Sequence, residues 1–291
     1  MGTLFNIGYR IIASNEVLYR TPIPVNFKAG YSFSYLTPSF YGNPVIKVKR
    51  SSDNNSRNFA PIEITNGDLE QWVGSGNNGI ITHWYNQSPE GSLYDLVDDA
   101  DDSAEPKIVI NGVLRTQNGK PSAYFDGNDD GLKNTNLDSA FNGNNILQAY
   151  TVGTANSNGA FWSFSKENSS TFYRFLRLDS TNRVRFIEYN NSTTGQVNSL
   201  NDVTGTQQLY TVEGNINNRS MYVNGTLIGT QSTTVGGFSG ISVFGIGGVY
   251  QVDRFDFNLL GDIQEIIFYN NDVSSQRTSI ESNIISYYDI T

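Results

Sequence analysis

Carboxylates and arginines supply most of the chemistry that this chain could perform. The sequence holds 28 acidic and 19 basic residues, a single histidine, His83, and no cysteine. A Ser-His-Asp triad would have to use His83, which lies in the apolar run 80–85, where a packed or edge-facing imidazole is the better expectation. Thiolate catalysis and Cys/His zinc sites need residues that the chain lacks. The sequence therefore argues against these three kinds of catalytic site.

One acidic segment has the spacing of calcium ligands. Asp126, Asn128 and Asp130 alternate along the chain as in the first half of an EF-hand loop. Leu137 stands at position twelve, where an EF-hand has a bidentate glutamate, and no helical pattern flanks the segment. A turn at the end of a strand explains it better. We therefore expect no cofactor and keep calcium here as a minority hypothesis.

A third group of residues has the types that bind sugars, because aromatic rings stack on sugar faces while charged and amide groups bond hydroxyls. The same aromatic residues could instead fill a core, and the arginines could form structural salt bridges. The glycan-binding candidates are Trp162, Tyr173, Arg174, Arg177, Arg185, Glu188, Tyr189 and Tyr250.

These side chains must be positioned by strands. Aromatic residues make up 13% of the 291 residues, charged residues only 16%, and there are 28 glycines, a mixture typical of many short strands joined by tight turns. Asn224-Gly225 between two apolar runs predicts a type I′ hairpin. The runs predict strands at 45–49, 80–85, 107–110, 123–125, 148–152, 161–164, 172–178, 184–189, 208–213, 220–223, 226–229, 241–246 and 262–269. This number of strands calls for two packed antiparallel sheets.

The two ends of the chain differ from the middle. After Ser274, a plausible N-cap, Ile280, Ile284, Ile285 and Tyr288 recur on one helical face, which predicts a short amphipathic C-terminal helix. Residues 1–30 contain short apolar runs and two alternate prolines. They read either as an edge strand and connector on the main domain or as an arm that docks on another subunit.

Charge and length exclude some partners and suggest a route of production. The net charge of −9 argues against a broad nucleic-acid surface, and no apolar run approaches a membrane span. The first nine residues lack the pattern of a signal peptide. A chain without a signal or disulfides is expected to be made in a bacterial cytoplasm and released by lysis, as phage virion proteins are.

Four segments, in order, resemble a known family. Residues 48–53 (VKRSSD) and 82–88 (THWYNQS) resemble motifs of arabinofuranosidase B-type catalytic domains and their phage relatives. Residues 118–121 (NGKP) and 124–129 (YFDGND) are similar to laminin G-like segments, and 261–269 (GDIQEIIFY) resembles the family's closing strand. The resemblance covers about residues 31–291. It implies an all-β fold, a two-sheet antiparallel jelly-roll sandwich of the concanavalin A-like type with a short C-terminal helix.

The resemblance also implies where catalytic groups should stand. In this family the acid/base aspartate follows a Gly-Gly pair, and here Val249 follows Gly247-Gly248. The strand matched to the family's nucleophile, 171–178, has no carboxylate, although Glu188 or Asp253 could compensate. We therefore expect no enzymatic activity and no catalytic residues.

Three functions then compete. The first is a non-catalytic virion surface protein, a head-fibre, capsid-decoration or tail-fibre component. It would dock on other virion proteins through residues 1–30, assemble as an oligomer, and serve structural attachment, binding of a host surface polysaccharide, or both. The second is a free carbohydrate-binding module. The third is an arabinofuranosidase-type glycoside hydrolase with relocated carboxylates. The lost acid residue favours the first two.

Overall fold

The structure, a computed structural model, describes residues 23, 27–98, 104–166, 172–190, 193–199, 201–235, 238, 240–251 and 254–291. Most of the segment 1–30 therefore lies outside the described residues, as do Asp253 and the side chain of Tyr173.

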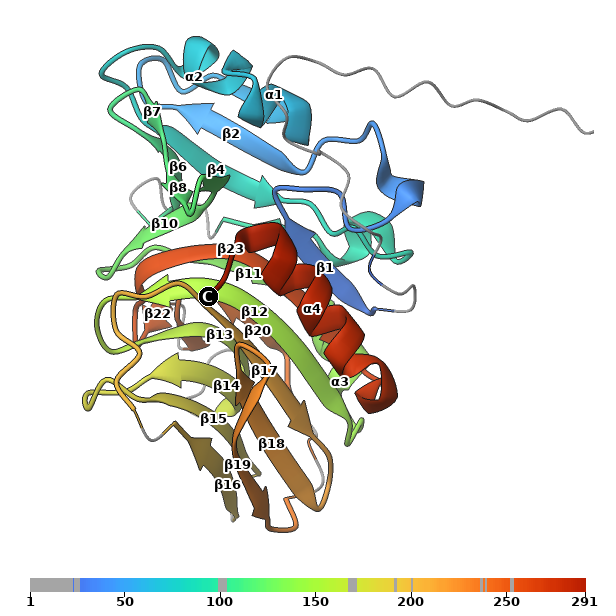
Figure 1. Ribbon diagram of the computed structural model, residues 1–291. Helices are drawn as coiled ribbons and strands as arrows, with labels where there is room; N and C mark the ends of the chain where they lie inside the picture. The colour runs from blue at the N-terminus through green and yellow to red at the C-terminus, as the bar shows by residue number, and fades with distance from the viewer. Residues whose placement is uncertain are drawn as a thin grey trace, which may run out of the picture.

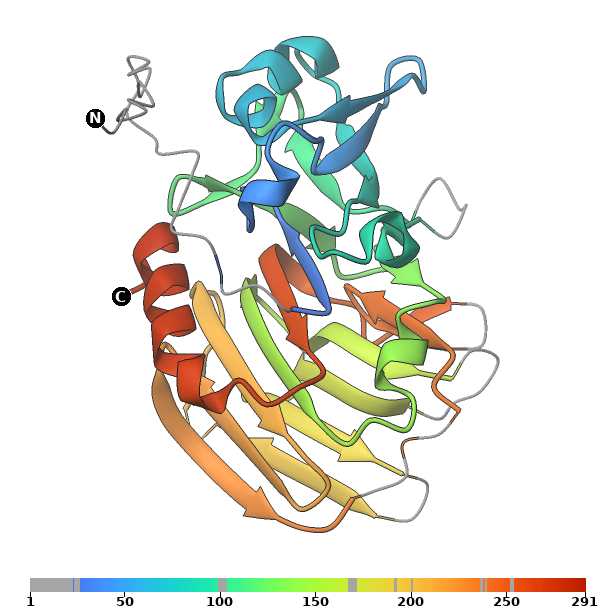
Figure 2. The ribbon, with the colours of Figure 1, turned by 90° about the vertical axis from the view of Figure 1, so that its right-hand side faces the viewer.

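Two antiparallel sheets pack face to face, which confirms the predicted β-sandwich (Figures 1 and 2). In order across the first sheet lie β19 (Thr226–Ser232), β18 (Asn218–Val223), β17 (Gln208–Gly214), β12 (Leu147–Ala155), β23 (Leu260–Tyr269) and β1 (Ala29–Ser32). Across the second lie β16 (Thr194–Asn198), β15 (Val184–Tyr189), β14 (Phe172–Leu178), β13 (Gly159–Ser165), β20 (Val243–Ile246), β11 (Leu132–Asn134), β5 (Leu96–Val97) and β4 (Gly79–Trp84).

A smaller group of strands joins the two sheets at one end of the molecule. It contains β2 (Ile46–Arg50), β3 (Ser56–Phe59), β6 (Lys107–Ile110), β7 (Val113–Leu114) and β10 (Ala123–Asp126), which link β4 to β23. Two further hairpins are β8 (Thr116–Gln117) with β9 (Lys120–Pro121), and β21 (Val249–Gln251) with β22 (Arg254–Asp256).

Alternation along the strands separates the inner face from the outer face. In β17, Tyr210 and Val212 join the core between the sheets, whereas Leu209 belongs to a second core on the outer face. The turn between β18 and β19 has φ of 48° at Asn224 and 77° at Gly225, which places both residues in the left-handed region that the predicted type I′ hairpin requires.

The predicted C-terminal helix is present as α4 (Arg277–Tyr288) and lies across the outer face of the first sheet (Figure 1). Ile280, Ile284 and Tyr288 are buried there against Tyr150 and other members of the second core. Ser274 begins a short 3-10 turn, Ser274–Gln276, ahead of the helix, and its N–H donates to Asp272 Oδ1 at 2.9 Å.

Three helices were not predicted: α1 (Pro61–Thr65), α2 (Asp68–Val73) and α3 (Asp138–Phe141). The first two cover the small group of strands (Figure 2). Each has four to six residues, which is too short to produce a helical period in the sequence. Within the described part of the chain, no helix has the length and apolar character needed to cross a membrane.

A charged triad lies fully buried on the inward side of both sheets. Glu188 on β15 contacts Arg174 on β14 at 3.1 Å and Arg219 on β18 at 2.8 Å, and all three side chains have no exposed surface. Arg174 also donates to the carbonyl of Asn144 at 3.1 Å, and Arg219 donates to that of Thr233 at 2.9 Å. Burial lowers the pKa of Arg174 to about 10, so it remains charged at neutral pH. The Glu188 carboxylate therefore links the two sheets through its ion pairs with Arg174 on β14 and Arg219 on β18.

Replacing Glu188 by glutamine should destabilise the protein strongly, because it would leave two guanidinium groups buried without a counter-charge. We expect a loss of roughly 3–5 kcal/mol in urea unfolding, the range found when one partner of a buried ion pair is removed. The matched control is Glu90→Gln, which breaks the surface pair with Lys28 at 2.5 Å and should cost less than about 1 kcal/mol. Equal effects of the two variants would show that the triad does not hold the sheets together.

Candidate functional site

Four of the predicted glycan-binding residues lie in the interior. Trp162 is fully buried, and its indole N–H donates to Thr151 Oγ1 at 3.0 Å. Arg174 and Glu188 belong to the buried triad, and Tyr250 is 2% exposed. These side chains point inward from their strands or, for Tyr250, into a small apolar cluster under the β21–β22 hairpin. As folded, they offer no surface to a sugar.

Three other candidates are accessible and share one face of the second sheet. Arg177, Arg185 and Tyr189 are partly exposed, on the side of β14 and β15 opposite to that of Leu176 and Phe186 in the core. The backbone of Tyr173 lies in β14, but its side chain is outside the described residues.

The position expected for the acid/base residue is apolar and closed. Val249 has no exposed surface and begins β21, next to the buried ring of Tyr250. His83 is half-buried, and burial lowers the pKa of its imidazole.

The predicted calcium segment does bring carboxylates together. Oxygens of Asp126, Asp129 and Asp130 lie within 4.8 Å of one another, so the cluster contains Asp129 where the sequence pattern had suggested Asn128. Burial raises the pKa of Asp130 to about 7, and Lys107 Nζ lies 3.6 Å from its Oδ1. The lysine therefore places a positive charge beside this carboxylate cluster.

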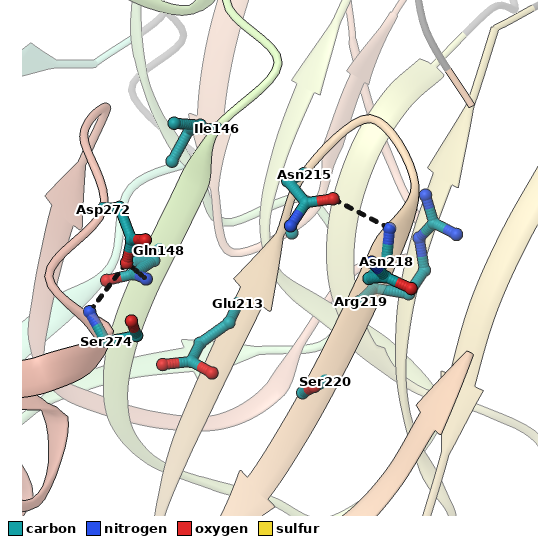
Figure 3. A pocket seen from close by; sticks show the side chains of 10 residues that line it. Ile146, Gln148, Glu213, Asn215, Asn218, Arg219, Ser220, Asp272 and Ser274 are labelled. Carbon is teal, nitrogen blue, oxygen red and sulfur yellow. Dashed lines mark hydrogen bonds between the residues drawn. The ribbon is translucent and has the colours of Figure 1, made fainter. Parts of the chain in front are cut away.

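An open pocket of about 250 Å³ lies on the outer face of the first sheet, beside the N-terminal end of α4 (Figure 3). The β17–β18 hairpin forms one wall and the segment after β23 forms the other, with β12 beneath. The residues that line it are Ile146, Gln148, Glu213, Gly214, Asn215, Asn218, Arg219, Ser220, Asp272 and Ser274. Amide, carboxylate and hydroxyl groups predominate and none of the ten is aromatic, so a ligand would be held by hydrogen bonds.

The pKa values of two carboxylates in this pocket shift in opposite directions. Burial raises the pKa of Glu213, and the nearby charges of Glu281 and Asp272 add to the effect. The backbone N–H of Ser274 contributes most to holding the pKa of Asp272 below its ordinary value. Tyr222 Oη lies 3.3 Å from Glu213 Oε2, and Arg277 Nε lies 3.8 Å from Glu213 Oε1. Two carboxylates with opposite pKa shifts thus line one pocket.

The sequence analysis missed this pocket because its residues come from three distant segments. Glu213 stands on a predicted strand, and Asp272 just before the predicted helix, but only the packing of α4 against β17 brings them near each other. The one local signal was Asp272 two residues before Ser274, which is the arrangement of a capping carboxylate.

No protein-family model and no curated protein sequence matches the chain. Solved structures do match. The chain is similar to a GH54 α-L-arabinofuranosidase variant soaked with 4-nitrophenyl α-L-arabinofuranoside, with a TM-score of 0.68 at 13% identity over 90% of this chain and 63% of that one. It is also similar to an arabinofuranosidase complexed with arabinofuranosyl-α-1,2-xylobiose, with a TM-score of 0.65 at 12% identity over 89% and 62%.

A carbohydrate-binding domain, the Ruminococcus gnavus IT-sialidase CBM40 bound to α2,3 sialyllactose, matches 55% of this chain and 95% of that one, at 13% identity and a TM-score of 0.47. The chain spans less than two thirds of the length of the two arabinofuranosidases. The two arabinofuranosidase matches confirm the fold expected from the arabinofuranosidase B-type resemblance. The chain has a β-sandwich fold that carbohydrate-active proteins share.

Proposed function

We propose that this chain recognises a glycan without cleaving it, through the pocket between the β17–β18 hairpin and α4. The observation that carries the proposal is the lining of this pocket, where Gln148, Asn218 and Ser220 offer amide and hydroxyl groups around the carboxylates of Glu213 and Asp272. Such groups bond sugar hydroxyls in both directions, as donors and as acceptors. The arabinofuranosidase-like fold supports a saccharide as the ligand class.

The absence of catalysis is part of the proposal and rests on two observations. Val249, which the resemblance places at the acid/base position, is buried and cannot transfer a proton. In the pocket, Asp272 already accepts bonds from Gln148 at 3.2 Å and from the Ser274 backbone at 2.9 Å, so it stabilises the turn into α4.

We further propose that the protein is displayed on a virion surface, as a head-fibre, capsid-decoration or tail-fibre component, and meets a host polysaccharide there. The support is the sequence resemblance to phage relatives of the family and the segment 1–30. Of that segment, Ile23 and Phe27 are buried beside α4, and the Ile23 N–H donates to the Leu36 carbonyl at 3.1 Å. This anchoring leaves residues 1–22 as the part proposed to reach another subunit.

Glycan binding should depend on the pocket. Glycans that the unaltered protein binds on a glycan array would be titrated by calorimetry. Glu213→Gln should weaken their binding about tenfold or more, because a hydrogen bond to a charged group contributes about 1.5–3 kcal/mol. Glu90→Gln, the same chemical change on the surface ion pair with Lys28, should leave affinity unchanged. If both variants bind as the unaltered protein does, the pocket is not the site.

A second candidate function is favoured by one observation: the carboxylates of Glu213 and Asp272 line the same pocket. Such a pair is the acid and nucleophile pattern of a retaining glycosidase. We expect no sugar release from arabinofuranosyl-substituted polysaccharides by the unaltered protein. Turnover that disappears in both Glu213→Gln and Asp272→Asn, each folded by its thermal melt, would establish this second function instead.

The virion proposal predicts assembly that depends on the N-terminal segment. The full chain should elute from size-exclusion chromatography as an oligomer. A variant lacking residues 1–22 should elute as a monomer, because it has lost the segment proposed to dock on another subunit. It should stay folded, because Ile23 and Phe27 retain their contacts with α4. Peptides of the chain should also be found by mass spectrometry in purified virions. A monomeric full chain, or its absence from particles, would contradict the proposal.

A further inference from the structure

Two arginines stand side by side on the outer face of the second sheet. Arg177 on β14 lies directly opposite Arg185 on β15 in the antiparallel register, so both side chains leave the sheet on the same side. Like charges at directly opposed positions destabilise a sheet unless something compensates for them. Asp179 is the carboxylate that contacts this pair, and it forms an ion pair with Arg185. Among the described residues, one ion-paired carboxylate therefore faces two positive charges.

Arg177 is the member of the pair that keeps its hydrogen-bonding capacity free. Within the described residues it forms no hydrogen bond and no ion pair, and its Nε is buried without a partner. Burial lowers the pKa of its guanidinium, and the charge of Arg185 lowers it further. The carboxylate of Asp179 is meanwhile occupied by the backbone N–H groups of Thr181 and Arg183, at 2.7 and 3.1 Å. An additional anion would satisfy Arg177 and relieve the repulsion.

The ring that covers Arg177 is itself unusual. Phe257 lies with its ring centroid 4.6 Å from the Arg177 Cζ and is 38% exposed. Its φ of 53° is in the left-handed region that favours glycine and is costly for an aromatic residue. The Ala160 N–H holds the Phe257 carbonyl at 2.8 Å. A partly exposed aromatic ring is thus held, against its backbone preference, beside a guanidinium that forms no hydrogen bond or ion pair with the described residues.

We propose that Arg177, Arg185 and Phe257 bind an acidic sugar residue, with its carboxylate on the guanidinium groups and its ring on Phe257. A carboxylate is planar and matches the fork of an arginine in a bidentate contact. Phe257 supplies the stacking surface that the pocket beside α4 lacks. The site lies on a different sheet from that pocket, and the inference rests on the proposed function only in taking the ligand to be a saccharide.

The test is calorimetric titration of the full chain with oligogalacturonate and with its methyl ester, which keeps the rings and removes the charge. Oligogalacturonate should bind at least tenfold more tightly than the ester, and Arg177→Gln should abolish the difference. Arg57→Gln is the matched control, because Arg57 also lies over an aromatic ring, that of Phe59 at 4.8 Å, but is paired with Glu63. It should bind as the unaltered protein does.

Phe257→Gly separates a binding role from a structural one. Glycine adopts this φ without strain, so the melting temperature should stay the same or rise while affinity for oligogalacturonate falls at least tenfold. Equal affinity for the acid and its ester, or equal effects of Arg177→Gln and Arg57→Gln, would overturn the proposal. Dextran sulfate binding as tightly as oligogalacturonate would overturn the carboxylate assignment. Preference for the acid that persists in Glu213→Gln would support this site even if the pocket proposal failed.

Discussion

The antiparallel pairing of β12 with β23 is the constraint on which the rest of this fold depends. All nine residues of β12 are buried, as are nine of the ten in β23, because the sandwich core covers one face and α4 the other. A strand pair enclosed on both faces must satisfy most of its polar groups internally. Asp262 does so with Arg115, at 2.8 Å, and Glu265 with the hydroxyl of Tyr288, at 3.1 Å. These bonds tie the central pair to the small strand group and to the helix.

The position of α4 follows from this enclosure and, in turn, creates the pocket. The helix covers Tyr150 and Leu209 on the outer face, but its N-terminal end stops short of the β17–β18 turn. Beyond that end, the outward-facing residues of the same strands are polar, among them Gln148 and Glu213. Where apolar cover ends, polar side chains and the turn before the helix enclose an open space. A site for a polar ligand therefore arises at the margin of the core.

The alternation of strand faces divides the arginines into two roles. Arg174 and Arg177 are three residues apart on one strand, so they must leave it on opposite sides. Arg174 turns inward and shares Glu188 with Arg219, where Coulomb attraction offsets the cost of burial. Arg177 turns outward and lies beside Arg185 with one carboxylate between them. The same residue type thus stabilises the interior and leaves a cationic face outside.

Local pattern was sufficient for most of the longer strands and for the C-terminal helix, but not for the shorter strands and helices. Apolar alternation located the thirteen predicted strands, from 45–49 to 262–269, within a few residues. Asn224-Gly225 predicted a hairpin, and the period of Ile280, Ile284 and Tyr288 predicted the helix. Each of these signals lies within one segment of the sequence. The sequence could also state that Arg174 and Arg177 face opposite ways. It could not state which one is buried, since that depends on which face of β14 meets the other sheet. Nor could it join Glu213 to Asp272 or Phe257 to Arg177, because these neighbours are far apart along the chain and only tertiary packing brings them together.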